Sequence, residues 1–359
     1  MNTISTPYLG IIEGFFGRSW TWAQRQIYAN FLALNQFNFY IYAPKSDAFL
    51  RKYWQENWPA NTQHALHNLR ETYSAAQIDF GIGLSPHEIY LNDSHDNRQK
   101  LKQRVQQINT LAPTILCLLF DDMRGDIPNL ANIQIELMHE IAEISNAQHI
   151  IFCPTYYSFD PVLEKVFGTM PETYWQDLNR HLDKKIEIFW TGEKVCSTGY
   201  SAQHLRSVTE LLGRKPFLWD NYPVNDGAVK ANLLHLRAVN ESHSQIQHAV
   251  AGHALNPMNQ AWLSQISLAS LPRAYRDQNH YHSEKVLQEI CVQLCGETLA
   301  EQLLQDIPLL QDKGLKNISE EEKNALLNRY STWPQNPFCA EIVDWLHGGY
   351  IFDPACLTE

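Results

Sequence analysis

Short apolar runs alternate with longer amphipathic segments along most of the chain. The runs are rich in Ile, Val, Leu, Phe and Tyr, and strands this short suit burial on both faces of a parallel sheet. The segments between them place apolar residues at helical spacing, as in Ser94–Thr110 and Asn129–Ile144. The pattern therefore predicts strands that alternate with helices. The predicted strands are Leu9–Glu13, Phe39–Ala43, Phe80–Leu84, Thr114–Phe120, His149–Cys153, Ile186–Trp190, Phe217–Trp219 and Ala249–Ala254.

This alternation is typical of an α/β fold, and eight such strands predict a (β/α)8 TIM barrel. An open doubly wound sheet is the alternative, but no Gly-x-Gly-x-x-Gly motif follows the first strand. The strand-like runs then stop, and four helical segments follow. They are Ser283–Cys295, Thr298–Gln311, Ser319–Arg329 and Pro337–Leu346. We expect a barrel domain over residues 1–272 and a small all-α domain or extension over residues 273–359.

Composition excludes some classes of function. The net charge is −11 without a long run of either sign, so the basic surface of a nucleic-acid-binding protein is not expected. The sequence has no stretch of 18 or more apolar residues, so no membrane span is expected. The 7 cysteines are irregularly placed, and Cys117, Cys153 and Cys196 lie in or beside apolar runs, where buried free thiols are expected. With no recognisable signal peptide, these features predict a cytoplasmic protein, and nothing in them indicates an oligomeric state.

Polar, aromatic and glycine residues follow seven of the apolar runs. In a barrel of this kind the functional site lies at the carboxyl ends of the strands, so these residues are expected on one rim. Together they predict a cavity for a polyhydroxylated ligand. The segments are Glu13–Gly17, Pro44–Asp47, Asp121–Asp122, Thr155–Tyr157, Trp190–Gly192, Trp219–Asp226 and Asn256–Pro257.

Asp121 and Asp122 form the sharpest local feature. They directly follow an apolar run and must lie at the strand end, because unpaired burial of a charge costs too much. Neighbouring carboxylates disfavour double ionisation, so the pKa of one should rise. A carboxylic acid that is protonated near neutral pH can give its proton to a leaving oxygen.

Two other interpretations of the pair are open at this point. Taken alone, two consecutive aspartates more often begin a helix, as N-cap and first-turn acid. They could also bind a divalent metal, although the sequence shows no clustered histidines at strand ends to complete such a site. The carboxylates available to a metal site are Glu13, Asp47, Asp220 and Asp226.

Seven motifs, in order and with similar spacing over residues 9–258, resemble glycoside hydrolase family 84, which contains the O-GlcNAcases and the bacterial enzymes once called hyaluronidases. The motifs are IEGFFG (12–17), YIYAPKSD (40–47), FDD (120–122), CPTYY (153–157), WTG (190–192), DNYPVND (220–226) and NPM (256–258). The resemblance implies a (β/α)8 barrel and substrate-assisted retention. In that mechanism the substrate's own 2-acetamido oxygen attacks the anomeric carbon and forms an oxazoline.

The resemblance also implies roles for individual residues. Asp121 would hold the acetamido N–H, and Asp122 would protonate the glycosidic oxygen and then deprotonate the attacking water. The Gly14 carbonyl and Lys45 would bind near the sugar's 3-hydroxyl. Tyr157 would hydrogen-bond the reacting acetamido group. Around the acetamido methyl group and the sugar would lie Cys153, Thr191, Val195 and Trp219, and the sugar hydroxyls would be bound by Asn221, Asp226 and Asn256.

The sequence thus predicts a retaining exo-β-N-acetylglucosaminidase that removes β-linked GlcNAc from a glycoconjugate, with O-GlcNAc-modified protein among the candidates. No cofactor and no metal are expected. The alternatives are a non-catalytic barrel that binds GlcNAc glycans and a metal-dependent barrel hydrolase. The aglycone is left open between a protein, a glycan terminus, a cell-wall fragment and hyaluronan.

Overall fold

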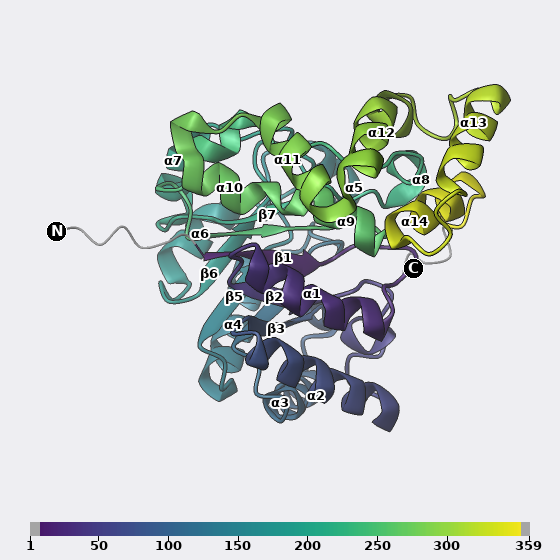
Figure 1. Ribbon diagram of the computed structural model, residues 1–359. Helices are drawn as coiled ribbons and strands as arrows, with labels where there is room; N and C mark the ends of the chain where they lie inside the picture. The colour runs from purple at the N-terminus through teal and green to yellow at the C-terminus, as the bar shows by residue number, and fades with distance from the viewer. Residues whose placement is uncertain (1–7, 353–359) are drawn as a thin grey trace.

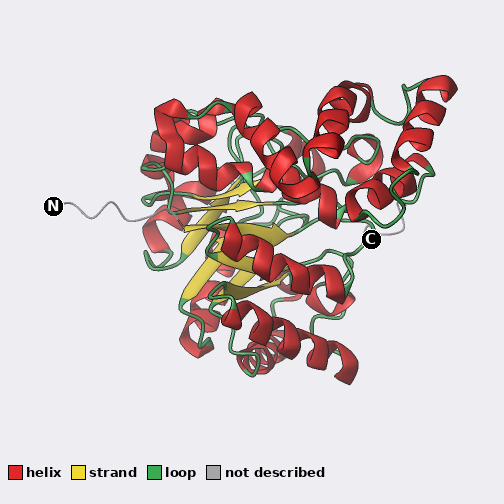
Figure 2. Cartoon of the chain, viewed as in Figure 1, coloured by secondary structure: helices red, strands yellow, loops and turns green. Residues whose placement is uncertain are grey.

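Eight parallel strands close into a barrel in a computed structural model that describes residues 8–352. Each strand pairs with the next along the chain, and the last pairs with the first. Figure 2 draws the strands in yellow among the surrounding helices. The prediction of a (β/α)8 barrel is therefore confirmed. The strands are β1 (Tyr8–Glu13), β2 (Phe39–Tyr42), β3 (Asp79–Leu84), β4 (Ile115–Leu119), β5 (His149–Cys153), β6 (Glu187–Trp190), β7 (Phe217–Asp220) and β8 (Gly252–Leu255).

The strand bounds follow the apolar runs closely, with one clear difference. The run predicted as Ala249–Ala254 enters the sheet only at Gly252. The N–H of Ala249 bonds the carbonyl of Ile246 and closes a turn, so the first residues of the run belong to that turn. An apolar run marks burial, but the backbone partners decide where the strand begins.

Helices cover the outside of the barrel (Figure 1). Several begin where a side chain satisfies the free N–H groups of the first turn: Thr21 and Gln24 form a capping box, and Ser94 accepts from Asn97 N. The helices up to residue 280 are α1 (Trp22–Leu34), α2 (Ala60–Ala75), α3 (His95–Asn109), α4 (Leu130–Ile144), α5 (Val162–Phe167), α6 (Tyr174–His181), α7 (Ala202–Leu212), α8 (Gly227–Lys230), α9 (Ala261–Leu268) and α10 (Ser270–Asp277), with the short turns η1 (Ala48–Leu50), η2 (Ile89–Asn92), η3 (Glu241–Gln245) and η4 (Gln278–His280).

The remaining described chain is helical, as predicted. Its elements are α11 (Ser283–Cys295), α12 (Glu297–Ile307), the π-helical turn η5 (Pro308–Lys313), α13 (Glu320–Tyr330) and α14 (Pro337–Leu346). The segment predicted as one helix over Thr298–Gln311 changes character at Pro308. Proline has no N–H to give to the α-helical ladder, which accounts for the change.

The C-terminal helices pack against the barrel and against the loop that follows β7, beside α8 (Figure 1). The Gln311 side-chain oxygen accepts the N–H groups of Leu236 and Arg237, and the indole of Trp345 donates to the Ala231 carbonyl. These bonds tie the loop after β7 to the C-terminal helices. The domain boundary after residue 272 stays a prediction.

Within residues 8–352, no helix combines the length and the apolar character that a membrane span requires.

A buried ion pair fixes the carboxyl end of β1. Arg25 of α1 donates to both Glu13 oxygens at 2.8 and 2.5 Å, and the Tyr40 hydroxyl donates to the same carboxylate at 2.5 Å. The side chains of Arg25 and Glu13 are 5% and 0% exposed. Because a buried charge without its partner is costly, this pair ties α1 to the strand end next to Gly14.

We expect Arg25→Met to lower the free energy of unfolding by about 3–5 kcal/mol, because it leaves the Glu13 charge buried without its cation. Chemical denaturation would measure the loss. The double variant Glu13→Gln/Arg25→Met should recover part of it. A matched control is Arg276→Met, which removes an exposed pair with Asp277 and should cost no more than about 1 kcal/mol. An equal loss in the single and double variants would contradict this account.

Candidate active site

All the site residues predicted from the sequence line one cavity of about 170 Å³ at the carboxyl ends of the strands. Parallel pairing brings these ends to one rim, although the residues are far apart in the chain. The cavity is lined by Gly14, Lys45, Asp121, Asp122, Cys153, Tyr157, Thr191, Val195, Trp219, Asn221, Asp226 and Asn256, together with Phe16, Cys196 and Val224.

Asp121 and Asp122 follow β4 directly and do not begin a helix. The next helix, α4, starts at Leu130, and Asn129 stands at its N-cap position. Asp122 has a positive φ of 60°, which is uncommon for a residue with a side chain and is worth a functional explanation. The helix-cap interpretation of the pair is therefore wrong.

A buried lysine joins the two carboxylates. Lys45 Nζ contacts Asp121 Oδ2 in a close ion pair and lies 3.4 Å from Asp122 Oδ2. Arg51 Nη1 lies 3.9 Å from the same Asp122 oxygen. The side chains of both cations are almost completely buried, so their attraction for the carboxylates is poorly screened by water.

The two aspartates differ in their surroundings. Asp121 is buried, and its Oδ1 has no hydrogen-bond partner among the described residues. Asp122 is more open, with its side chain 33% exposed. Burial is nevertheless the largest influence on the Asp122 carboxyl and raises its pKa above the ordinary value. The charge of Asp121 raises that pKa further, whereas Lys45 and Arg51 oppose the rise.

Trp219 and Gly14 lie against each other at the base of the cavity. A Cβ on Gly14 would overlap the Trp219 ring, so only glycine allows the backbone this close. Lys45 Nζ lies 5.8 Å from the centre of that ring and 5.9 Å from the ring of Phe16. The indole N–H donates to Asn221 Oδ1 at 3.1 Å, which orients the ring.

The amide of Asn221 is held by three hydrogen bonds. Its oxygen accepts from Trp219 and, at 3.0 Å, from Asn256 Nδ2, while its nitrogen donates to the Val195 carbonyl at 2.8 Å. Asn256 in turn accepts the Gly14 N–H at 3.2 Å. An amide nitrogen carries two hydrogens, so these bonds leave one N–H of Asn221 for a ligand.

Tyr157, Cys153 and Thr191 form the side of the cavity that follows β5 and β6. Burial, followed by the charges of Asp122 and Asp121, raises the pKa of Tyr157 well above its ordinary value, so its hydroxyl stays protonated. Burial likewise raises the pKa of the Cys153 thiol, which makes it an apolar wall rather than a nucleophile.

Asp226 reaches the cavity from the loop after β7. It accepts the Phe16 N–H at 2.9 Å, and burial raises its pKa above the ordinary value, partly offset by that hydrogen bond. This contact links the first and seventh strand ends across the rim.

Some contributors to the site were not predicted. Arg51 lies six positions after Lys45 and carries no signal in the sequence, because its approach to Asp122 depends on how η1 turns the chain. Cys196 was expected to be buried but is half-buried and lines the cavity, because it belongs to the loop after β6 rather than to the strand. Phe16 and Val224 stand inside recognised motifs but were not singled out.

The other carboxylates considered for a metal site with Asp121 and Asp122 have different partners. Glu13 pairs with Arg25, and Asp47 accepts from the side chains of Tyr42 and Trp58. The sequence also gave no sign of clustered histidines, and on this point the expectation was wrong. Asp220 receives two histidines that are distant in the chain, His243 and His253.

Comparisons with known proteins identify the family of the chain. A family model described as β-N-acetylglucosaminidase matches residues 9–306. Protein O-GlcNAcase of Rattus norvegicus and that of Mus musculus are each 27% identical over 226 residues, which is 60% of this chain but only 24% of either relative. The solved structure of a mutant O-GlcNAc hydrolase from Thermobaculum terrenum is 26% identical with a TM-score of 0.79, and the match covers 95% of this chain and 81% of that one. The chain therefore belongs to the β-N-acetylglucosaminidase family, glycoside hydrolase family 84.

Proposed function

We propose that this chain is a retaining exo-β-N-acetylglucosaminidase that uses its substrate's acetamido group as the nucleophile. The observation that carries the proposal is the buried Asp121 Oδ1, which has no hydrogen-bond partner among the described residues although it belongs to an ion-paired carboxylate. An acceptor left in this state costs free energy, and an amide N–H from a ligand would satisfy it.

In this mechanism Asp121 orients the 2-acetamido group. Its free oxygen accepts the amide N–H, and its negative charge offsets the positive charge that develops as the acetamido oxygen attacks the anomeric carbon. The protonated Tyr157 hydroxyl is a suitable partner for the same group. Cys153, Val195 and Trp219 give the cavity an apolar side, which suits the methyl group of the acetamide.

Asp122 serves as the general acid and then the general base. Its raised pKa favours a protonated carboxyl that can give its proton to the departing glycosidic oxygen. Once that proton is gone, the carboxylate can take one from the water that opens the oxazoline. Because the acetamido oxygen forms the bond to the anomeric carbon, neither aspartate has to act as nucleophile.

The remaining residues suit the recognition of one terminal sugar. In this proposal the Gly14 carbonyl and Lys45 bind the 3-hydroxyl side, and Asn221, Asp226 and Asn256 bind the other hydroxyls. That all five line the cavity supports these roles. A cavity of about 170 Å³ with Trp219 in its wall suits a single sugar residue, which supports removal from a chain end.

A glycoconjugate with terminal β-linked GlcNAc is the proposed substrate. The relatives named Protein O-GlcNAcase and O-GlcNAc hydrolase favour O-GlcNAc-modified protein as the aglycone. Comparing kcat/KM for GlcNAc- and GalNAc-terminated substrates, including a modified peptide, would rank the candidates.

A non-catalytic GlcNAc-binding barrel is the competing function. A protein that only binds sugar does not need the Asp122 carboxyl, with its raised pKa, beside Asp121. The presence of both aspartates therefore favours an enzyme over a binding protein.

We expect the purified chain to hydrolyse a methylumbelliferyl β-N-acetylglucosaminide with a chelator present, and a thiazoline mimic of the oxazoline to inhibit it competitively. The fluorescence of the released methylumbelliferone measures both the hydrolysis and its inhibition. GlcNAc binding without turnover of any β-GlcNAc substrate would support the binding barrel instead. Activity that disappears with chelation and returns with a divalent ion would support the metal-dependent hydrolase.

We expect Asp122→Ala to slow hydrolysis of a substrate with a poor leaving group by about 10²–10⁴-fold, because the departing oxygen loses its proton donor. A dinitrophenyl leaving group needs little protonation and should react much closer to the wild-type rate. Wild-type activity should fall as pH rises through the raised pKa of Asp122, since the acid must be protonated, and this alkaline fall should vanish in the variant. Wild-type activity of Asp122→Ala on the poor leaving group would disprove the role.

We expect Asp121→Asn to lose about 10²–10³-fold in kcat whatever the leaving group, because an amide cannot offset the charge of the forming oxazoline. Steady-state rates on the same two substrates would separate this loss from that of Asp122→Ala. Asp126→Asn is the matched control, because Asp126 lies in the same loop but pairs with exposed Arg124. Recovery of Asp121→Asn on the better leaving group would contradict the assignment.

A further inference from the structure

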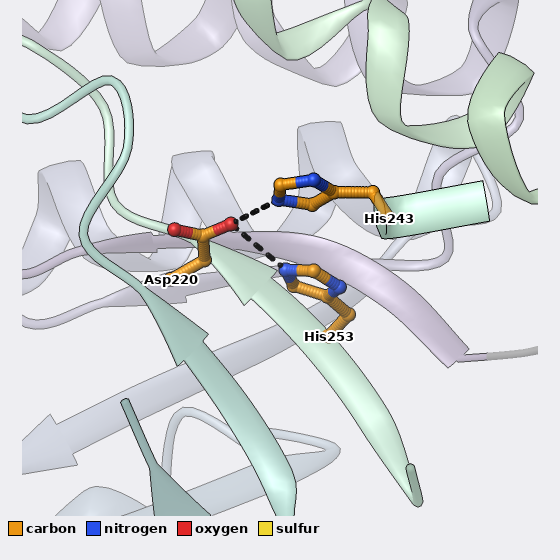
Figure 3. Close-up of side chains that lie close together, drawn as sticks. All are labelled: Asp220, His243 and His253. Atoms are coloured by element: carbon orange, nitrogen blue, oxygen red, sulfur yellow. Dashed lines mark hydrogen bonds and ion pairs between the residues drawn. The ribbon is translucent and has the colours of Figure 1, made fainter. Parts of the chain in front are cut away.

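A buried cluster lies behind the sugar cavity, on the other side of β7. It consists of Asp220, His243 of η3 and His253 of β8, and is called the Asp220 cluster below (Figure 3). His243 Nε2 lies 2.9 Å and His253 Nε2 lies 3.3 Å from the same Asp220 oxygen, Oδ2. Trp219 and Asn221, on either side of Asp220, line the cavity, whereas Asp220 does not. Successive strand residues face opposite sides, which accounts for this separation.

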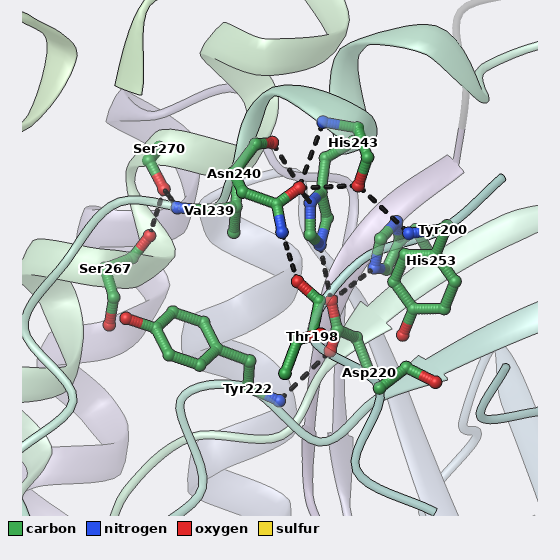
Figure 4. A network of polar contacts seen from close by, with 12 residues as sticks. Thr198, Tyr200, Asp220, Tyr222, Val239, Asn240, His243, His253, Ser267 and Ser270 are labelled. Carbon is green, nitrogen blue, oxygen red and sulfur yellow. Dashed lines mark hydrogen bonds and ion pairs between the residues drawn. The ribbon is translucent and has the colours of Figure 1, made fainter. Parts of the chain in front are cut away.

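Both ring nitrogens of His243 face hydrogen-bond acceptors. Its Nδ1 lies 3.2 Å from both the backbone and side-chain oxygens of Asn240 (Figure 4). The Asn240 amide nitrogen donates to the Thr198 carbonyl, which confirms that the amide oxygen faces the histidine. Nδ1 therefore faces acceptors and carries a hydrogen. Nε2 faces a carboxylate oxygen, so it too is placed to donate a hydrogen.

His253 needs only one hydrogen. Its Nδ1 lies 2.9 Å from the Tyr275 hydroxyl, which can donate, and its Nε2–H then points at Asp220. Burial lowers the pKa of His253, against the opposite effect of Asp220, so this ring is neutral. Burial raises the pKa of Asp220, but the hydrogen bonds from the two histidines outweigh burial and hold that pKa well below its usual range. Both histidines are therefore placed to donate to the Asp220 carboxylate.

The second oxygen of Asp220 connects the cluster to the sugar cavity. Asp220 Oδ1 accepts the N–H of Tyr222 at 3.1 Å and closes a turn whose central residue is Asn221. The Asp220 carbonyl also accepts the Asn256 N–H at 2.8 Å. The Asp220 carboxylate thus connects two groups: Oδ2 contacts the two histidines, and Oδ1 bonds the backbone around Asn221.

We propose that His243, protonated on both ring nitrogens, and His253 are positioning residues that hold Asp220, and through it Asn221, in the orientation that binds the sugar. This inference rests on the proposed function, which places the free N–H of Asn221 on a sugar hydroxyl. The contact is remote from the bond that breaks, so it stabilises substrate and transition state alike and acts on KM rather than kcat.

A divalent metal is the competing occupant, because the ligand atoms of the three residues all lie within 4.8 Å of one another. A metal bound to both Nε2 atoms would displace the proton that joins His243 to Asp220. It would leave one net positive charge in a cluster whose members are each no more than 3% exposed. With a proton in place of the metal ion, the cluster has no net charge. Because burial of an uncompensated charge is costly, a proton is the more favourable occupant.

Kinetics of Asp220→Asn test the positioning. The variant keeps the shape of the side chain but removes its charge, and we expect KM for an aryl β-N-acetylglucosaminide to rise about tenfold, with kcat changed far less. Asn221→Ala should raise KM similarly, and the double variant should be no worse than Asn221→Ala, because both act through one contact. His248→Gln, an exposed histidine change, is the control. Independent, multiplying effects of the two substitutions would overturn the inference.

If Asp220→Asn does not fold, as judged by circular dichroism, His243→Gln takes its place, because glutamine retains one neutral donor. We expect a smaller rise in KM for it and the same lack of additivity with Asn221→Ala. A KM unchanged from that of the wild type in a folded His243→Gln would overturn the positioning role.

Nitrogen NMR of histidine-labelled full-length chain tests the protonation. At neutral pH we expect one buried histidine with both ring nitrogens protonated, lost in His243→Gln, and metal analysis that finds no stoichiometric ion. A neutral His243 ring, or a bound metal whose removal by a chelator changes these signals, would overturn the proposal. An inactive wild-type chain would refute the proposed function alone. The NMR result and the affinity of Asp220→Asn for the thiazoline, expected to be about tenfold weaker, would still decide this one.

Discussion

Closure of the parallel sheet is the constraint on which the rest of this molecule depends. Every strand has a partner on each side, so the sheet has no edge, and all eight carboxyl ends meet at one rim. Side chains from seven strand ends can then converge on a small cavity without any loop reaching far. The buried pair of Glu13 and Arg25 serves the same geometry, because it fixes the strand end from which Gly14 approaches Trp219.

Within that cavity, local surroundings give two neighbouring carboxylates different properties. Asp121 is buried against Lys45 with one oxygen unsatisfied, while Asp122 sits further out with a raised pKa. The two aspartates are adjacent in the chain, and the backbone turns at Asp122, which has a positive φ. The proposed division of labour, one aspartate for the acetamide and one for the proton, follows from this difference in burial and charge.

The sequence predicted the barrel and the segments on its rim because their signals are local, whereas the resemblance to the family assigned individual residues such as Val195 to the cavity. Apolar runs mark strands, and the residue that follows a strand must lie on the rim. The sequence did not predict Arg51 or the Asp220 cluster as parts of the site, because both depend on contacts between segments that are distant in the chain. His243 lies 23 and His253 lies 33 positions after Asp220, with no spacing that marks a site. The break at Pro308 was readable in principle, since proline ends an α-helical ladder, but helical periodicity concealed it.

The bonds from Gln311 and Trp345 to the loop after β7 have a consequence for the order of assembly during synthesis. Asp226 belongs to that loop, and the two residues that bond the loop, Gln311 and Trp345, lie some 85 and 119 positions after Asp226 in the chain. When all eight strands have emerged from the ribosome, Gln311 and Trp345 have not yet emerged. The proposed sugar recognition would therefore mature after the barrel itself, because the last helices must emerge and dock before the rim takes its final shape.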